Sequence, residues 1–266
     1  MRHYLSTAIL CVSLFLLGSC QSEKTDYVAF LYKYMPTSDS VDYSREYWER
    51  QVAMSERARK EMPWAQLVPE MEWKHFVVPV RVNNEALDEA RSVIYEELAP
   101  RIMNMSMEEA ALEVNHWCHE KVSYQPSDGR TSPPLTTMAN AIGRCGEEST
   151  FTVAAMRAVG IPARQVYCPR WSHTDSNHAW VEVWIADDDK GNGRWRFMGA
   201  CEPEAVLDKG WFNWAASRAM LVHTRVFGAE YEGKEEILDR TKCYTEINCL
   251  PTYAPTKNLK VLVQDA

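Results

Sequence analysis

The sequence lacks several features that would decide its class at once. It has 266 residues with a net charge of −8 and no basic stripe, which argues against a nucleic-acid partner because nothing would neutralise the phosphates. It has no Cys-x-x-Cys pair, which argues against a structural zinc site. It also has no internal repeat, no low-complexity segment and no long acidic run. With 46% hydrophobic and 25% charged residues, the composition is that of an ordinary folded protein.

Long apolar runs are equally scarce, and the one present lies at the N-terminus. Residues 4–17 are too short for a comfortable membrane span but have the length of a signal-peptide core. The run ends at Cys20 in the letters LGSC, which resemble the lipobox of bacterial lipoproteins. The resemblance implies that residues 1–19 are a signal peptide and that the Cys20 thiol carries a lipid. The alternative is an ordinary secretory signal with a chance cysteine.

The expected location follows from this leader. The chain should reside in the bacterial cell envelope and contact a membrane through lipidated Cys20. Gln21 and Glu23 do not resemble an inner-membrane retention signal, so the outer membrane is the expected one. No second apolar run of about 20 residues appears, and the rest of the chain should be soluble.

Helices are expected in the first half of the chain. Residues 44–61 contain neither Gly nor Pro and favour a helix, and residues 85–98 predict a second helix closed by Pro100. The short apolar segment 76–80 predicts a strand or an extended stretch. Residues 125–134 are typical of a loop.

Two further helices are expected around the middle of the chain. Ser106 and Glu109 form the pattern of a capping box and predict a helix over residues 107–121. Helical character resumes after Gly143 and lasts until Gly160.

The second half favours strands. Residues 164–167, 178–184 and 194–198 are β-branched or alternate in polarity, while 217–227 fits a helix or a strand. Residues 259–263 alternate like one more strand. Helices early and antiparallel strands late predict an α+β fold and not a doubly wound sheet.

Cys145 is the first candidate for chemistry, because it lies between Gly143 and Gly146 directly before a helical run. A thiol at a helix N-terminus meets unpaired N–H groups and the positive end of the helix dipole, which favour the thiolate. The same groups can hold an oxyanion, and Gly146 leaves room for a substrate backbone. A buried cysteine at a turn is the alternative.

His178 opens a predicted strand thirty-three residues later. A cysteine on a helix and a histidine on a nearby strand suit a nucleophile and base pair, in which the imidazole takes the thiol proton and later gives it to the leaving group.

The segments GRCGEEST, AMRAVGIPAR and HAWVEVW, followed by a Trp-containing strand, together resemble the transglutaminase-like superfamily, which includes microbial transglutaminase-like proteins and peptide N-glycanases. The resemblance covers roughly residues 113–212. It implies a papain-like core, with the nucleophile helix packed on an antiparallel sheet, and assigns Cys145 as nucleophile and His178 as base. The expected domains are an N-terminal mostly helical extension (20–105), a transglutaminase-like domain (106–235) and a C-terminal tail with a final strand (236–266).

The chain departs from the family at the third catalytic position. The family has an Asp where Gly199 stands here. Glu202 is the nearest carboxylate, although strand alternation would place it on the opposite face unless a bulge intervenes. Glu204 is a weaker substitute, and the absence of any orienting carboxylate is the third possibility.

Other features are weaker. Residues 116–119 read His-Trp-Cys-His, but neighbouring helix positions point in different directions, so they cannot share one metal ion. Core packing is expected for Trp117, although the resemblance allows it an oxyanion role. Nothing in the sequence calls for a cofactor.

The sequence thus predicts a lipid-anchored cysteine enzyme that acts on amide bonds of peptide, protein or glycopeptide substrates, with hydrolysis favoured over transamidation. Loss of the Asp at Gly199 supports an alternative, a non-catalytic module that binds peptides or glycans. A part of an envelope assembly, whose tail strand pairs with a partner, is the third possibility.

Overall fold

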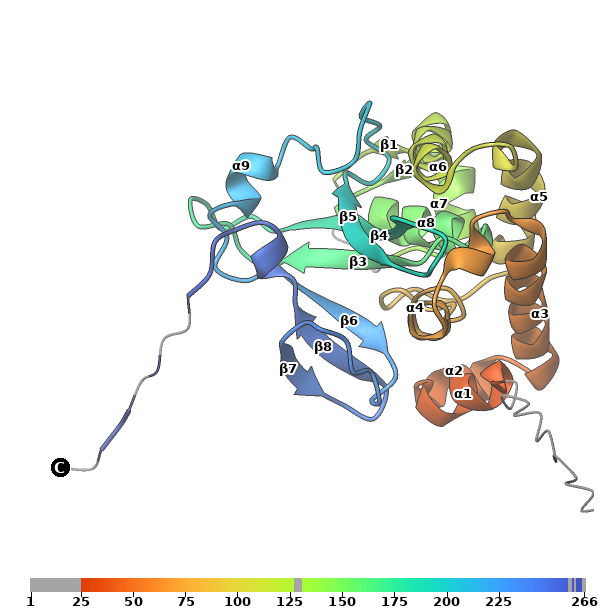
Figure 1. The fold of residues 1–266 in the computed structure, drawn as a ribbon, viewed down its shortest axis with the longest axis horizontal. Helices are drawn as coiled ribbons and strands as arrows, with labels where there is room; N and C mark the ends of the chain where they lie inside the picture. Colours follow the sequence, from red (N-terminus) through yellow and green to blue (C-terminus); the bar gives the residue numbers. More distant parts are fainter. Residues whose placement is uncertain (1–24, 127–130, 258–259, 261, 265–266) are drawn as a thin grey trace, which may run out of the picture.

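The computed structural model describes residues 25–126, 131–257, 260 and 262–264. The predicted signal peptide and Cys20 lie outside these residues. The described chain combines helices with an antiparallel sheet, which confirms the α+β prediction (Figure 1). No helix within these ranges is both long and apolar enough to cross a membrane.

The N-terminal part is helical, as predicted. The N-cap of α3 is Ser44, whose hydroxyl accepts a hydrogen bond from the Tyr47 amide, so this helix starts where the sequence placed it. The elements are α1 (Tyr27–Tyr34), α2 (Thr37–Asp42), α3 (Arg45–Glu61), η1 (Ala65–Leu67), α4 (Glu70–Phe76) and α5 (Ala90–Ile102).

Of the strand or extended stretch predicted over 76–80, no strand forms: Phe76 ends α4, and residues 77–80 pair with no strand in the described part of the chain. Their carbonyl groups are bound by a side chain instead of a neighbouring strand. The buried Arg91 guanidinium donates hydrogen bonds to the carbonyls of Val77, Val78 and Pro79. This long-range contact is invisible to local sequence patterns.

The helix expected over 85–98 starts later and ends later. The carboxylate of Glu85 accepts hydrogen bonds from the amides of Val82 and Asn83, which closes a turn ahead of the helix. α5 then begins at Ala90 and continues through Pro100 to the buried Ile102. A proline in the last turn removes only one backbone hydrogen bond from the helix.

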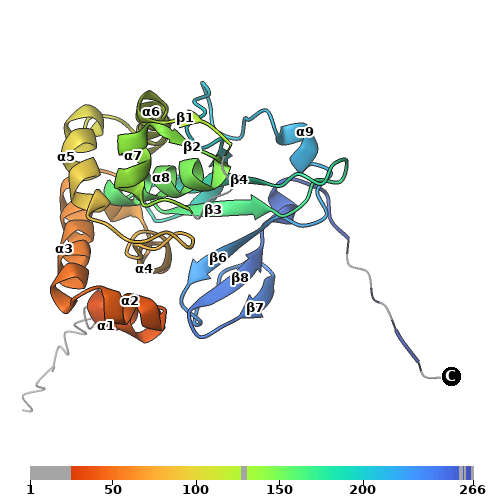
Figure 2. The same ribbon diagram turned by 180° about the vertical axis from the view of Figure 1, so that it is seen from behind.

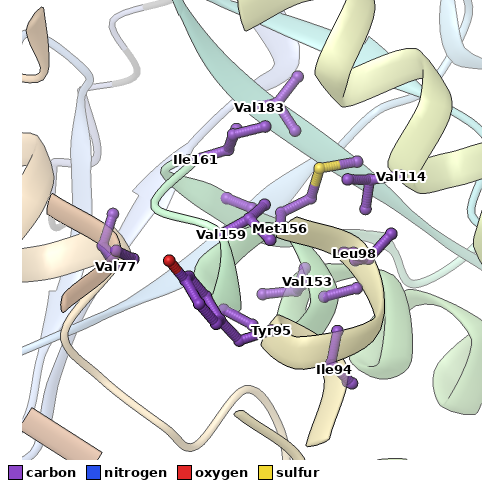
Figure 3. Close-up of a cluster of buried hydrophobic side chains, with 14 of the residues drawn as sticks. Val77, Ile94, Tyr95, Leu98, Val114, Val153, Met156, Val159, Ile161 and Val183 are labelled. Atoms are coloured by element: carbon purple, nitrogen blue, oxygen red, sulfur yellow. The ribbon is translucent and has the colours of Figure 1, made fainter. Parts of the chain in front are cut away.

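The central helices surround one core. The capping box of Ser106 and Glu109 is present and starts α6 (Met107–Lys121) as predicted. A short helix that the sequence did not predict, α7 (Pro134–Asn140), follows. α8 (Cys145–Ala158) is buried along almost its whole length. Figure 3 shows its side chains Val153 and Met156 among side chains of α5, α6 and the sheet.

The main sheet has six antiparallel strands in the order β5-β4-β3-β6-β8-β7. α8 packs against β3 and β4, and β6, β8 and β7 extend the sheet beyond β3, where β6 contacts α4 (Figure 2). The strands are β3 (Ala163–Cys168), β4 (His178–Ala186), β5 (Gly193–Met198), β6 (His223–Phe227), β7 (Ile237–Arg240) and β8 (Tyr244–Asn248). A separate parallel pair, β1 (Ser123–Tyr124) and β2 (Ile142–Gly143), precedes α8.

The C-terminal region differs from the prediction in two ways. Residues 237–248, assigned to a tail, form β7 and β8 and complete the sheet. Of the strand expected over 259–263, the structure describes residues 260, 262 and 263, which pair with no strand in the described part of the chain. The ambiguous segment 217–227 contains β6; α9 (Asn213–Ala216) precedes it, and η2 (Leu250–Thr252) follows β8.

Candidate active site

Cys145 is the first residue of α8, and its position is fixed by the turn before it. The Glu147 carboxylate accepts a hydrogen bond from the Arg144 amide at 3.0 Å, which caps the helix. Gly143 is required at this turn, because a Cβ there would lie 2.8 Å from the Glu147 Cβ. The helix therefore starts at the thiol, as the sequence predicted.

The thiol lies at the beginning of β4. Backbone amides of Ala179 and Gly146 donate hydrogen bonds to the Cys145 sulfur. Burial nevertheless raises the pKa of Cys145 and outweighs the lowering by these two amides and by Arg144. The Gly146 amide at the helix N-terminus thus favours the thiolate, as expected, but burial outweighs it in the free protein.

His178 is the first residue of β4 and directly precedes Ala179, whose amide contacts the sulfur. Its imidazole is buried, and burial lowers the pKa of His178 to about 4. The Nε2 atom is buried and has no hydrogen-bond partner in the described part of the chain. At neutral pH the site thus holds a neutral thiol and a neutral imidazole.

Glu202 returns to the missing Asp position through a turn. Gly199 and Glu202 form an isolated antiparallel bridge, and Cys201 adopts a left-handed φ of 55°. Asn115 of α6 holds this turn, since its Nδ2 donates to the carbonyl of Gly199 at 2.9 Å and its Oδ1 accepts from the amide of Cys201 at 3.0 Å. Strand alternation therefore does not apply here, and Glu202 folds back over Gly199.

The carboxyl group of Glu202 fills the volume above Gly199. A Cβ on Gly199 would lie 2.9 Å from the Glu202 Cβ and closer still to Oε2. The Nε1 of Trp211 donates to both carboxyl oxygens, each at 3.0 Å. The sequence did not point to Trp211, because nothing in its neighbourhood marks it as different from the other nine tryptophans.

A second carboxyl group, Glu148, lies one helical turn after Cys145 and was also missed. Burial raises the pKa of Glu148 to about 8, and the charges of Glu202 and Glu147 add to the effect. The charge of Glu148 in turn contributes to the raised pKa of Cys145. Helical periodicity could have found Glu148, because residues three positions apart lie on the same face of a helix.

The remaining candidates have other contacts. Trp117 is buried in the core and stacks on Phe151 with ring centroids 5.5 Å apart, as the core-packing interpretation expected. Glu204 forms an ion pair with Lys209 at 2.8 Å. His116 contacts Arg101, whereas His119 bonds the Cys201 carbonyl, so the two histidines diverge.

The geometry defines a class of protein: a cysteine at a helix N-terminus packed on an antiparallel sheet whose strand begins with a histidine. Residues 96–200 match the transglutaminase-like superfamily. This segment, from α5 to the turn after β5, is therefore a transglutaminase-like domain.

Similarity beyond this family match is distant. No curated protein sequence matches the chain. A solved structure of a proposed cysteine protease from Cytophaga hutchinsonii is similar, with 14% identity and a TM-score of 0.35. The likeness covers 65% of this chain and spans 62% of that protein.

Proposed function

We propose that this chain is an exported, lipid-anchored cysteine hydrolase that cleaves amide bonds of peptide, protein or glycopeptide substrates in the bacterial cell envelope, at the outer membrane. The observation that carries the proposal is the placement of Cys145 at the start of α8, in hydrogen-bond contact with the residue that follows His178. The membership of residues 96–200 in the transglutaminase-like superfamily supports cysteine-based acyl transfer.

The proposed reaction has two stages. The Cys145 sulfur attacks the carbonyl carbon of the substrate while His178 accepts the thiol proton. The amide C–N bond breaks, the departing amine takes that proton, and a thioester remains on Cys145. Water then attacks the thioester with His178 again as base, which releases the acid and restores the thiol.

Neutral resting groups fit this sequence of proton transfers. A histidine whose pKa is lowered to about 4 is unprotonated at neutral pH, so one ring nitrogen keeps a free lone pair for the thiol proton. The amides of Gly146 and Ala179 are placed to stabilise negative charge that develops beside the sulfur. An amine in place of water would give transamidation, but water is abundant, so hydrolysis is favoured.

A second candidate is a module that binds peptides or glycans without turnover. The raised pKa of Cys145 and the unpartnered Nε2 of His178 favour it, because neither group is activated in the free protein. Acylation by p-nitrophenyl acetate separates the two functions. A hydrolase should release p-nitrophenol and carry a transient acetyl group on Cys145, and Cys145→Ala should abolish both. A binding module should give no adduct at Cys145 above that of the control thiol Cys243, which is half-buried like Cys145.

A further inference from the structure

The imidazole of His178 is oriented by aromatic rings. Its buried Nε2 has no hydrogen-bond partner in the described ranges, so no carboxylate holds that nitrogen. Four aromatic rings surround it instead, with centroids between 4.8 and 6.1 Å from that of the imidazole. They belong to Trp171, Trp180, Trp211 and Phe212.

Trp211 differs from the other three rings. Trp171, Trp180 and Phe212 are buried and belong to one core cluster, which fixes them by packing. Trp211 is 63% exposed, yet its ring is the nearest of the four to the imidazole, at 4.8 Å. An exposed indole needs another anchor if it is to hold one orientation.

Glu202 supplies that anchor. Both carboxyl oxygens accept from the Trp211 Nε1, and the carboxyl group is itself confined above Gly199. The turn beneath it is tied to α6, since the Asn115 Nδ2 also donates to the Glu202 carbonyl at 3.2 Å. Asn115, Glu202, Trp211 and His178 thus form a continuous chain of contacts from a core helix to the imidazole.

We propose that Trp211 is the positioning residue of this site, which transmits the constraint of the Glu202 carboxylate to the His178 ring in place of a direct carboxylate–imidazole hydrogen bond. The inference rests on the proposed function, because it gives His178 the role of base. It also explains the glycine at position 199, which leaves room for the Glu202 carboxyl group that holds the Trp211 indole.

Neighbouring charges leave Glu202 able to act as an acceptor. Burial raises its pKa, while the hydrogen bond from Trp211 lowers it, and Glu204 contributes a smaller rise. Glu148 approaches from α8, but its own pKa of about 8 keeps it largely protonated at neutral pH.

The test measures the rate of iodoacetamide labelling of Cys145 at pH 7 on the full-length chain in detergent, with Cys243 as the internal control. Trp211→Phe keeps the ring and removes the N–H, and Glu202→Gln removes the charge. Each should slow labelling roughly three- to tenfold, the effect of one lost hydrogen bond. The double variant should be no slower than either single variant, since both changes break the same link. Trp214→Phe, at an exposed tryptophan that contacts His173 and not His178, should leave the rate unchanged.

A rescue variant distinguishes a positioning role of Trp211 from a general effect of the substitution on the stability of the fold. Gly199→Asp combined with Glu202→Ala places a carboxylate directly in the vacated volume, and Trp211→Phe in that background should change the rate by less than about twofold. Equal slowing by Trp211→Phe in both backgrounds, or additive slowing with Glu202→Gln, would overturn the inference. If His178→Ala slows labelling and Trp211→Phe does not, the inference alone fails. If His178→Ala has no effect, the proposed function fails as well.

Discussion

The carboxyl group of Glu202 occupies the space that a side chain on Gly199 would enter, and it does so in hydrogen-bond contact with Trp211. Gly199 and Glu202 are three positions apart in the sequence, yet the turn between them brings Glu202 back over Gly199 at the end of the strand. Their relationship explains why this site holds no carboxylate on the strand itself. A larger side chain at position 199 would displace the Glu202 carboxyl group, so a substitution there tests whether this contact matters for the site.

Gly199→Ala should displace Glu202 from Trp211. The added Cβ would lie 2.9 Å from the Glu202 Cβ, closer than real contacts allow, so the glutamate must move. We expect acetylation of Cys145 by p-nitrophenyl acetate to slow as much as in Glu202→Gln. Unchanged acetylation in Gly199→Ala, with a slow Glu202→Gln, would show that the glutamate acts from elsewhere.

Glu148→Gln should change how stability depends on pH. The folded-state pKa of Glu148 is raised to about 8 from 4.5, so between these values the folded protein binds the proton that the unfolded chain has lost. This contribution to stability falls as pH rises from about 4.5 to 8. Relative to the wild type, Glu148→Gln should therefore gain on the order of 1–3 kcal/mol between pH 5 and pH 8. Urea unfolding at both pH values measures the gain, and a pH-independent difference would refute the assignment.

Arg164→Met should destabilise the fold strongly. Arg164 and Glu182 form a buried ion pair with Nε and Oε2 2.6 Å apart, and Glu182 is fully buried. Removing the guanidinium leaves an uncompensated carboxylate, at a cost of about 3–5 kcal/mol. Adding Glu182→Gln removes that charge while leaving an oxygen for the Tyr253 hydroxyl, so the double variant should recover part of the loss in urea unfolding. A double variant less stable than the single one would contradict this account.

Membrane attachment should depend on Cys20. In bacteria grown with labelled palmitate, the wild-type chain should become labelled and fractionate with membranes. Cys20→Ala should lose the label, while Cys243→Ala, an equally simple change far from the leader, should keep it. Labelling that persists in Cys20→Ala would remove the lipid anchor from the proposal.

The sequence predicted those parts of the fold that depend on interactions between residues close together in the chain, such as helix caps and strand alternation. The capping box of Ser106 and Glu109 started α6 at the expected residue, and alternation located β4. The start of α5 was not predictable, because it depends on how Glu85 closes the preceding turn. The missing strand at 76–80 depends on Arg91, a contact that only the packed structure creates.

The candidate site was predictable to a similar degree. Sequence motifs located Cys145 and His178, since both lie at the ends of regular elements. The return of Glu202 depends on Asn115, which lies 87 residues earlier, and the involvement of Trp211 depends on that return. The helix N-terminus favours the Cys145 thiolate as expected, but burial, which local sequence does not report, outweighs it.

The most direct test of the central claim, that Cys145 and His178 act as nucleophile and base, is the pH dependence of Cys145 acetylation in the wild type and in His178→Ala. Because burial lowers the pKa of His178 to about 4, the wild-type rate should persist at pH 5–6, where an ordinary histidine is largely protonated, and should fall only as pH approaches 4. His178→Ala should lower the rate at pH 7 by roughly a hundredfold or more, the usual contribution of a general base. Equal rates in both proteins across this range would contradict the account and leave the transglutaminase-like domain as a binding module.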